Sequence, residues 1–184
     1  MKKLILLVIS ILFMITQINV MAQCDLPFNE EGEYEVKEVV TLENSPTNAE
    51  IYAASMLAFA EIFKLVDDGI EVENEKLGYI SGSFTVAAKP HSLGAWKSFY
   101  KFSLRLDFRE SKYRMTVKYL SHHAYSSEND CYCPNKFKSE KCGVSCIPKG
   151  LWRKQKCEAH THVLEIISKL KSSINSNLTG DDNW

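Results

Sequence analysis

The sequence lacks the short motifs that mark the common enzyme chemistries. It contains no Gly-x-Ser-x-Gly nucleophile elbow, no glycine-rich phosphate loop, no Gly-x-Gly-x-x-Gly fingerprint and no His-Glu-x-x-His pair. Glycine and proline are scarce, with eight and five residues among 184, which excludes collagen-like and low-complexity chains. A formal net charge of −1 excludes a global electrostatic field that would attract nucleic acid. We therefore expect one globular, non-catalytic domain without a nucleic-acid partner.

Long apolar runs are absent beyond the N-terminus, where one such run has the features of a signal peptide. Lysines at positions 2 and 3 precede an apolar stretch over residues 4–16. The following Val20-Met21-Ala22 has the small residues that signal peptidase requires. The sequence therefore predicts a signal peptide over residues 1–22 and a periplasmic or extracellular protein. No transmembrane segment is expected after cleavage.

Two other arrangements of the N-terminus stay open. The apolar stretch up to Ala22 is almost long enough to serve as a membrane anchor. Cys24 lies close behind it, as in an outer-membrane lipoprotein, although Gln23 stands where a small residue normally precedes the lipidated cysteine. We retain the lipoprotein as the minor alternative to cleavage and export.

The alternation of apolar and polar residues predicts an α+β domain. An apolar helix is expected from about Thr47, which stands at capping-box spacing from Glu50, to residue 66, and an amphipathic helix over residues 151–174. Strands are expected over residues 34–42, 70–73, 79–88, 100–108 and 113–119. The resulting β-α-β-β-β-β-α order predicts a curved antiparallel sheet of about five strands with both helices on one face.

The same pattern divides the chain into three parts. After the signal peptide, residues 23–175 form a single domain. Residues 121–150 have no apolar periodicity and contain four of the six cysteines, so they are expected to be an insertion in that domain. The polar residues 176–184 are expected to be a flexible tail.

The clearest secondary-structure signal is the hairpin formed by the last two predicted strands. Its apolar side is continuous, and its polar side carries four cations among serines, threonine and tyrosine: Lys101, Arg105, Arg114 and Lys118. A solvated sheet face is the ordinary interpretation of such a pattern. The functional interpretation is a shallow platform for an anionic partner, such as a lipid head group, a glycan or an acidic protein segment.

Residues 34–119 also carry a set of short packing motifs, namely Glu38-Val39-Val40, Ile51-Tyr52, residues 59–63, residues 75–82 and Lys112-Tyr113-Arg114. With these motifs the chain resembles a secreted family of unknown function with a TATA-binding-protein-like (TBP-like) fold, common in Gram-negative gut and soil bacteria. The family usually has Asp-Gly at the hairpin turn, where this chain has Glu110-Ser111. The resemblance implies a TBP-like fold but no activity, and such a fold does not by itself imply DNA binding.

An even number of cysteines in an exported chain predicts disulfides. The six candidates are Cys24, Cys131, Cys133, Cys142, Cys146 and Cys157. Their connectivity stays open, except that a bridge between Cys131 and Cys133 fits disulfide geometry badly. Bridges would order residues 121–150, which cannot bury enough apolar surface by themselves.

Zinc is the alternative use of these cysteines. The candidate ligands are Cys131, Cys133, Cys142, Cys146, Cys157 and His160. Four histidines, namely His122, His123, His160 and His162, are expected on the surface. The sequence thus favours an exported binding or assembly module without a cofactor, whose partner is an anionic ligand or a cell-envelope protein. The alternative is an exported enzyme or zinc protein that uses the Cys/His-rich segment.

Overall fold

The computed structural model describes residues 24–63, 70–74, 78–89, 97–125, 130–134, 137–140, 142, 147 and 149–180. The predicted signal peptide, Cys146 and the last four residues lie outside this part of the chain.

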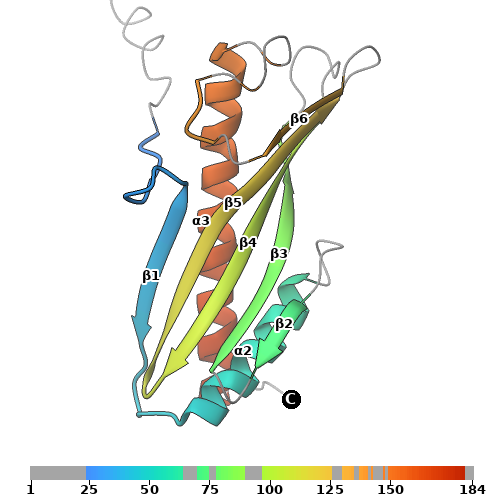
Figure 1. Cartoon of the computed structure of the whole chain (residues 1–184). Coiled ribbons are helices and arrows are strands. Elements are labelled where there is room, and N and C mark those ends of the chain that lie inside the picture. Colours follow the sequence, from blue (N-terminus) through green and yellow to red (C-terminus); the bar gives the residue numbers. More distant parts are fainter. Residues whose placement is uncertain are drawn as a thin grey trace, which may run out of the picture.

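One antiparallel sheet and two helices make up the described fold (Figure 1). The strands are β1 (Glu35–Thr41), β2 (Ile70–Asn74), β3 (Tyr79–Ala87), β4 (Lys97–Arg109), β5 (Lys112–Tyr125) and β6 (Asp130–Pro134), and the helices are α2 (Asn48–Phe63) and α3 (Lys149–Thr179). Five strands follow the order β1-β5-β4-β3-β2, and β6 pairs with β5. Both helices lie behind the sheet in Figure 1. The predicted α+β architecture is confirmed, and β6 is an additional strand.

The hairpin of β4 and β5 lies at the centre of the sheet. One of its faces is apolar and the other is polar. Leu104 pairs with Val117, and both side chains are fully buried against the helices. Ser103 pairs with Lys118 on the opposite face, which we call the outer face. Phe102 lies on the same inner face as Val117, as the alternation predicts.

A bulge near the middle of β5 changes which residues face inward. Phe102 pairs with Tyr119, whereas Lys101 pairs with Ser121, so Leu120 is the extra residue and is 37% exposed. Beyond Leu120 the inward positions become even-numbered, and His122 is fully buried. The prediction that His122 lies on the surface is therefore wrong, because the bulge shifts the side-chain alternation by one residue.

The first helix begins with the predicted capping box. The Thr47 backbone N–H donates to the Glu50 carboxylate at 2.8 Å, and the Glu50 N–H donates to the Thr47 hydroxyl at 3.3 Å. These two bonds satisfy N–H groups that would have no partner at a helix start. The apolar side of α2 packs on the sheet and on α3, with Ile51, Ala58 and Phe59 fully buried.

The second helix is longer than the sequence predicts. It begins at Lys149 and continues through residues 176–179, which the sequence predicts to be part of a flexible tail. Asn177 in this extension donates to the Ala54 carbonyl of α2 at 3.1 Å, and Ser173, one turn earlier, donates to Glu61 at 2.9 Å. Among the described residues, no helix has the length and apolarity needed to cross a membrane.

The described part of the cysteine-rich segment packs into the core. Phe137 and Trp152 are buried among the aromatic rings of the sheet. The Trp152 indole N–H donates to the Ser139 carbonyl at 2.8 Å, and the buried Lys156 ammonium donates to the Phe137 carbonyl at 2.9 Å. Aromatic packing and these bonds attach the segment to α3, and disulfides fix it further.

Candidate functional site

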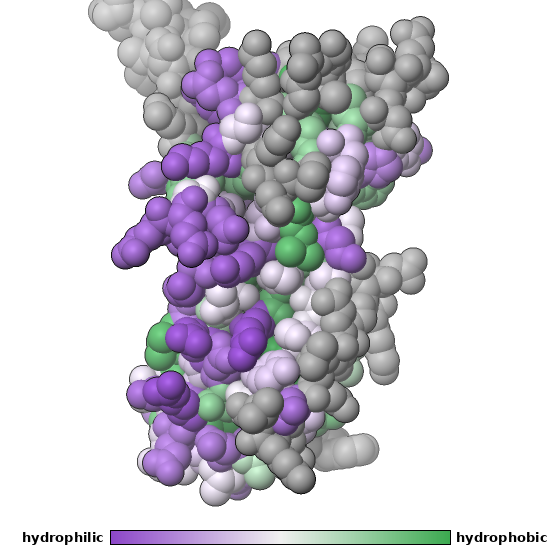
Figure 2. Space-filling view, viewed as in Figure 1, coloured by the Kyte–Doolittle hydropathy of each residue, from purple (hydrophilic) through white to green (hydrophobic). Residues whose placement is uncertain are grey.

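The outer face of the sheet carries all four predicted cations. Lys101 and Arg105 project from β4, and Arg114 and Lys118 project from β5, at positions that alternate with buried residues. In the coloured part of Figure 2, hydrophilic residues gather on this face and are interrupted by apolar patches. The four cations therefore share one polar face, as the alternation predicts, and three of them form ion pairs within the protein.

One group of ion pairs lies where β1 meets β5. Lys118 lies 3.4 Å from Glu35 and 3.5 Å from Glu33, and Lys37 lies 2.5 Å from Glu35. Burial by itself would raise the pKa of Glu35, but hydrogen bonds from Lys37 and Lys118 outweigh burial and hold that pKa below its usual value. Lys118 thus has two carboxylates beside it and is a weak candidate for a ligand contact.

A second group joins both arginines to one carboxylate. The Arg105 Nε–H donates to Asp107 at 2.8 Å, and an Arg114 terminal N–H donates to the other oxygen of Asp107 at 3.0 Å. The Arg105 guanidinium also lies 4.2 Å from the centre of the Tyr79 ring. Burial opposes ionisation of Asp107, yet the bonds from Arg114 and Arg105 lower its pKa below the usual value. Two positive charges therefore share one negative charge.

Lys101 differs from the other three cations. It has no ion-pair partner within the described part of the chain, and it pairs across the strands with Thr85 and Ser121. Lys101 lies six positions along β4 from Asp107, the residue that pairs with Arg114, so roughly 20 Å of extended strand separates Lys101 from Arg114. The structure therefore does not bring the four predicted cations to one place.

A hollow lies on the outer face at the closed end of the β4–β5 hairpin. It has a volume of about 320 Å³ and is lined chiefly by Val39, Gly78, Asp107, Arg109, Lys112 and Arg114. We call it the hairpin hollow. Neither Arg109 nor Lys112 has an ion-pair partner among the described residues, so the lining contains three cations and a single carboxylate.

Backbone geometry holds the hollow in shape. Gly78 has a φ of 67°, and a Cβ atom added there would lie 3.3 Å from the Phe108 carbonyl oxygen. The Phe108 N–H donates to the Gly78 carbonyl at 2.8 Å, which fixes β3 beside the hairpin end. At the turn, Ser111 takes a φ of 55° in place of the glycine that the resembling family has there.

The prediction included Arg114 but missed Arg109 and Lys112. Each occupies the next outward-facing position of its strand. Extending the predicted alternation by one step at the turn would therefore have identified them. The predicted strands end at residue 108 and begin again at residue 113, which leaves Arg109 and Lys112 in the turn. The structure extends β4 to Arg109 and begins β5 at Lys112, so both side chains stand on rigid strands.

The disulfide prediction is confirmed for the described cysteines. Cys24 is bonded to Cys157 and Cys133 to Cys142, and Cys131 is also disulfide-bonded. A thiol engaged in the Cys24–Cys157 bridge is not available for a lipid, which argues against the lipoprotein alternative.

Those of the predicted zinc ligands that the structure describes do not all gather at one point. Cys157 is bonded to Cys24, and His160 Nδ1 lies 2.7 Å from the hydroxyl of the buried Tyr34. Burial lowers the pKa of His160 and, by desolvation, raises that of Tyr34 above its usual range. Both side chains are therefore uncharged, and the hydrogen bond between them joins α3 to the N-terminal segment.

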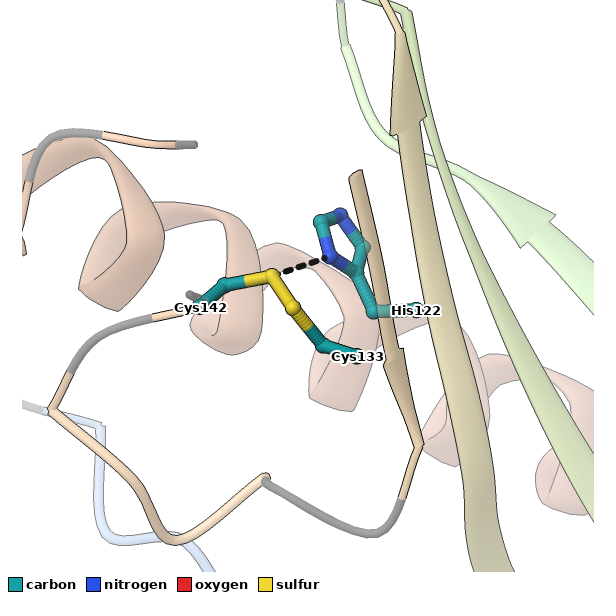
Figure 3. A group of neighbouring side chains, drawn as sticks. All are labelled: His122, Cys133 and Cys142. Carbon is teal, nitrogen blue, oxygen red and sulfur yellow. Dashed lines mark hydrogen bonds between the residues drawn. A yellow bond between two sulfur atoms is a disulfide. The ribbon is translucent and has the colours of Figure 1, made fainter. Parts of the chain in front are cut away.

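A different histidine meets the cysteines. His122 Nδ1 lies 3.2 Å from the Cys142 sulfur of the Cys133–Cys142 bridge (Figure 3). Burial, helped by the nearby His123, lowers the pKa of His122 to about 4. The ring is therefore neutral at physiological pH.

The fold resembles solved structures of bacterial proteins. A TBP-like protein from Parabacteroides distasonis gives a TM-score of 0.57 at 14% identity, covering 79% of this chain and 97% of that chain. A DUF4468 family protein from Bacteroides ovatus gives a TM-score of 0.56 at 13% identity, covering 79% of this chain and 89% of that chain. No protein-family model and no curated protein matches the sequence. At this identity the likeness shows the fold alone, and the chain has the TBP-like α+β fold that its sequence predicts.

Proposed function

We propose that the protein is an exported, non-catalytic binding module whose hairpin hollow binds an anionic group of a ligand or of a cell-envelope protein. One observation carries this proposal: Arg109, Lys112 and Arg114 line one depression, and Asp107 is the only carboxylate among the lining residues. An anion that enters the hollow meets more positive than negative charge. Phosphate, sulfate and carboxylate groups are the ligands that such side chains recognise.

The arginine geometry supports recognition of an oxyanion. Arg114 gives one terminal N–H to Asp107 and keeps its other donors free of any described partner. Asp107 therefore fixes the plane of the guanidinium while leaving donors for a ligand. Because Asp107 already accepts bonds from two arginines, its charge opposes an incoming anion less than that of an unpaired carboxylate would.

Disulfides support the exported location. Bridges such as Cys24–Cys157 persist in oxidising compartments and are rare in the cytosol. Together with the predicted signal peptide they favour the periplasm or the extracellular space. A binding module in these compartments meets phosphorylated, sulfated and uronic-acid groups of the envelope.

The proposal is tested by removing the two unpaired cations of the hollow. Pyrophosphate is titrated into wild-type protein and into the Arg109→Ser/Lys112→Ser variant, with affinity measured by calorimetry. We expect the double variant to bind at least about tenfold more weakly, since each charge-assisted hydrogen bond is worth about 1.5–3 kcal/mol. The melting temperature should change little, because neither side chain has an ion-pair partner within the described residues.

A matched control separates site binding from general charge. The Lys97→Ser/Lys101→Ser variant removes two positive charges from the other end of β4 on the same face. It should bind pyrophosphate with wild-type affinity. Equal weakening in both variants, or no weakening in either, would contradict the proposed site.

A further inference from the structure

His122 is a buried polar residue that the binding proposal does not use. Its side chain is fully buried, and its Nε2 atom has no hydrogen-bond partner among the described residues. Its Nδ1 atom lies 3.2 Å from the Cys142 sulfur of a disulfide, which is a poor hydrogen-bond acceptor. Buried polar groups are normally satisfied, and an unsatisfied one costs about 1–3 kcal/mol. In the oxidised protein, therefore, neither ring nitrogen has a strong partner within the part of the chain that the structure describes.

His122 and the two cysteines beside it come from three separate segments. His122 on β5 pairs directly with Cys133 on β6, and the Cys133–Cys142 bridge brings the third segment to the same point. The Nδ1 atom and the two sulfur atoms all lie within 4.8 Å of one another. Figure 3 shows the ring directed at the bridge.

We propose that reduction of the Cys133–Cys142 disulfide converts this group into a zinc site with His122 as the third ligand. A dithiol reductant supplies two electrons and two protons, so the S–S bond breaks, two thiols form and the reductant becomes a disulfide. Zinc binding then displaces both thiol protons to solvent, and the cation is held by two thiolates and the neutral imidazole. The proposal is independent of the hairpin hollow.

The ligand set matches known zinc chemistry. Two cysteines and one histidine form one of the standard three-ligand zinc sites, in which a fourth position stays open for water or another donor. Zn–S bonds of about 2.3 Å place the two sulfurs roughly 3.8 Å apart in a tetrahedral site. After reduction, rotation of the Cys133 and Cys142 side chains would separate the two sulfur atoms to this distance, so that both can bind the ion.

The surroundings hold the imidazole in place. The ring centre of His122 lies 4.5 Å from that of Tyr100 and 4.8 Å from that of Trp152. These rings restrict its rotation and keep it directed at the sulfurs. A preorganised ligand loses little conformational entropy when a metal binds.

The test compares zinc binding in the oxidised and the reduced protein. The purified full chain is reduced with a phosphine under argon, and Zn²⁺ is titrated against a chromophoric chelator. We expect the oxidised protein to bind no zinc at this site and the reduced protein to bind one equivalent. Substitution of Co²⁺ should give the charge-transfer bands of a tetrahedral thiolate complex.

Variants assign the site. His122→Phe keeps a flat ring among the aromatic neighbours and should weaken zinc binding by more than about tenfold. His123→Phe, at the adjacent exposed position, should leave zinc binding unchanged. If His122→Phe does not fold, Cys133→Ser provides the same test with a smaller change in volume. A reduced wild-type protein that binds no zinc, or one whose affinity survives the loss of His122 or Cys133, would overturn the proposal.

Discussion

Asp107 contributes the one negative charge in the lining of the hairpin hollow and accepts hydrogen bonds from both Arg105 and Arg114. We predict that Asp107→Asn strengthens pyrophosphate binding about three- to tenfold, because a neutral amide no longer opposes the anion. The free energy of unfolding should fall by less than about 1 kcal/mol, since both arginine side chains are 51% exposed and water screens their ion pairs. Calorimetry and urea unfolding measure the two effects. Glu33→Gln, which removes a carboxylate elsewhere on this face, is the control and should leave pyrophosphate affinity unchanged.

The same carboxylate predicts a dependence of stability on pH. Arg114 and Arg105 lower the pKa of Asp107 in the folded protein against the opposing effect of burial. Asp107 therefore stabilises the fold above its unfolded pKa of about 4 and loses this contribution as pH falls through the depressed folded pKa. The wild-type advantage over Asp107→Asn should thus disappear in acid, as urea unfolding across a pH series would show. A constant difference down to the most acidic folded sample would contradict this assignment.

At the scale of elements, the start of α2 depends on the capping box. Thr47→Ala removes the hydroxyl that accepts the Glu50 N–H bond, so that donor loses its partner. We predict a loss of about 1 kcal/mol in the free energy of unfolding. Thr41→Ala, at the exposed end of β1, is the matched control and should change stability by less than about 0.5 kcal/mol. Equal losses in both variants would mean that the cap contributes nothing specific.

The elements also show what the sequence could predict. The alternation from Tyr100 to Tyr119 predicted the central hairpin because each inward residue meets the same continuous core. The bulge at Leu120 could not be predicted, since it has no glycine or proline to mark it and depends on the pairing of β5 with β4 and β6. The candidate site was predicted only as a face. Its location at the hairpin end depends on which cations form ion pairs elsewhere on the face. Those pairs, such as Lys118 with Glu33, join residues that are distant in sequence, so the sequence alone does not reveal them.

At the scale of the whole molecule, a disulfide joins Cys24, the first described residue, to α3. Cys24 and Cys157 are 133 residues apart in sequence, so their bond strongly restricts the unfolded chain. We predict that Cys24→Ser/Cys157→Ser lowers the free energy of unfolding by about 2–5 kcal/mol. Urea unfolding measures this loss. The double variant should keep the far-ultraviolet circular dichroism of the folded protein, and a stability equal to that of wild type would contradict this role for the bridge.

Export and oxidation together predict the thiol content of the mature protein. Mass spectrometry of protein recovered from the periplasm or the medium should show a chain that begins at Gln23. No free cysteine occurs among the described residues, so alkylation before reduction should add no mass. An intact N-terminus or six alkylated thiols would contradict the exported, oxidised state.

The most direct test of the binding account is a nuclear magnetic resonance titration of the folded protein with pyrophosphate. The account predicts saturable shifts of the backbone amides around the hairpin hollow, from Asp107 to Arg114 and at Gly78, with little change near Lys101. The shifts should be lost in Arg109→Ser/Lys112→Ser. Shifts spread over all exposed cations without saturation, or saturable shifts centred away from the hairpin end, would contradict the claim that the hollow is the binding site.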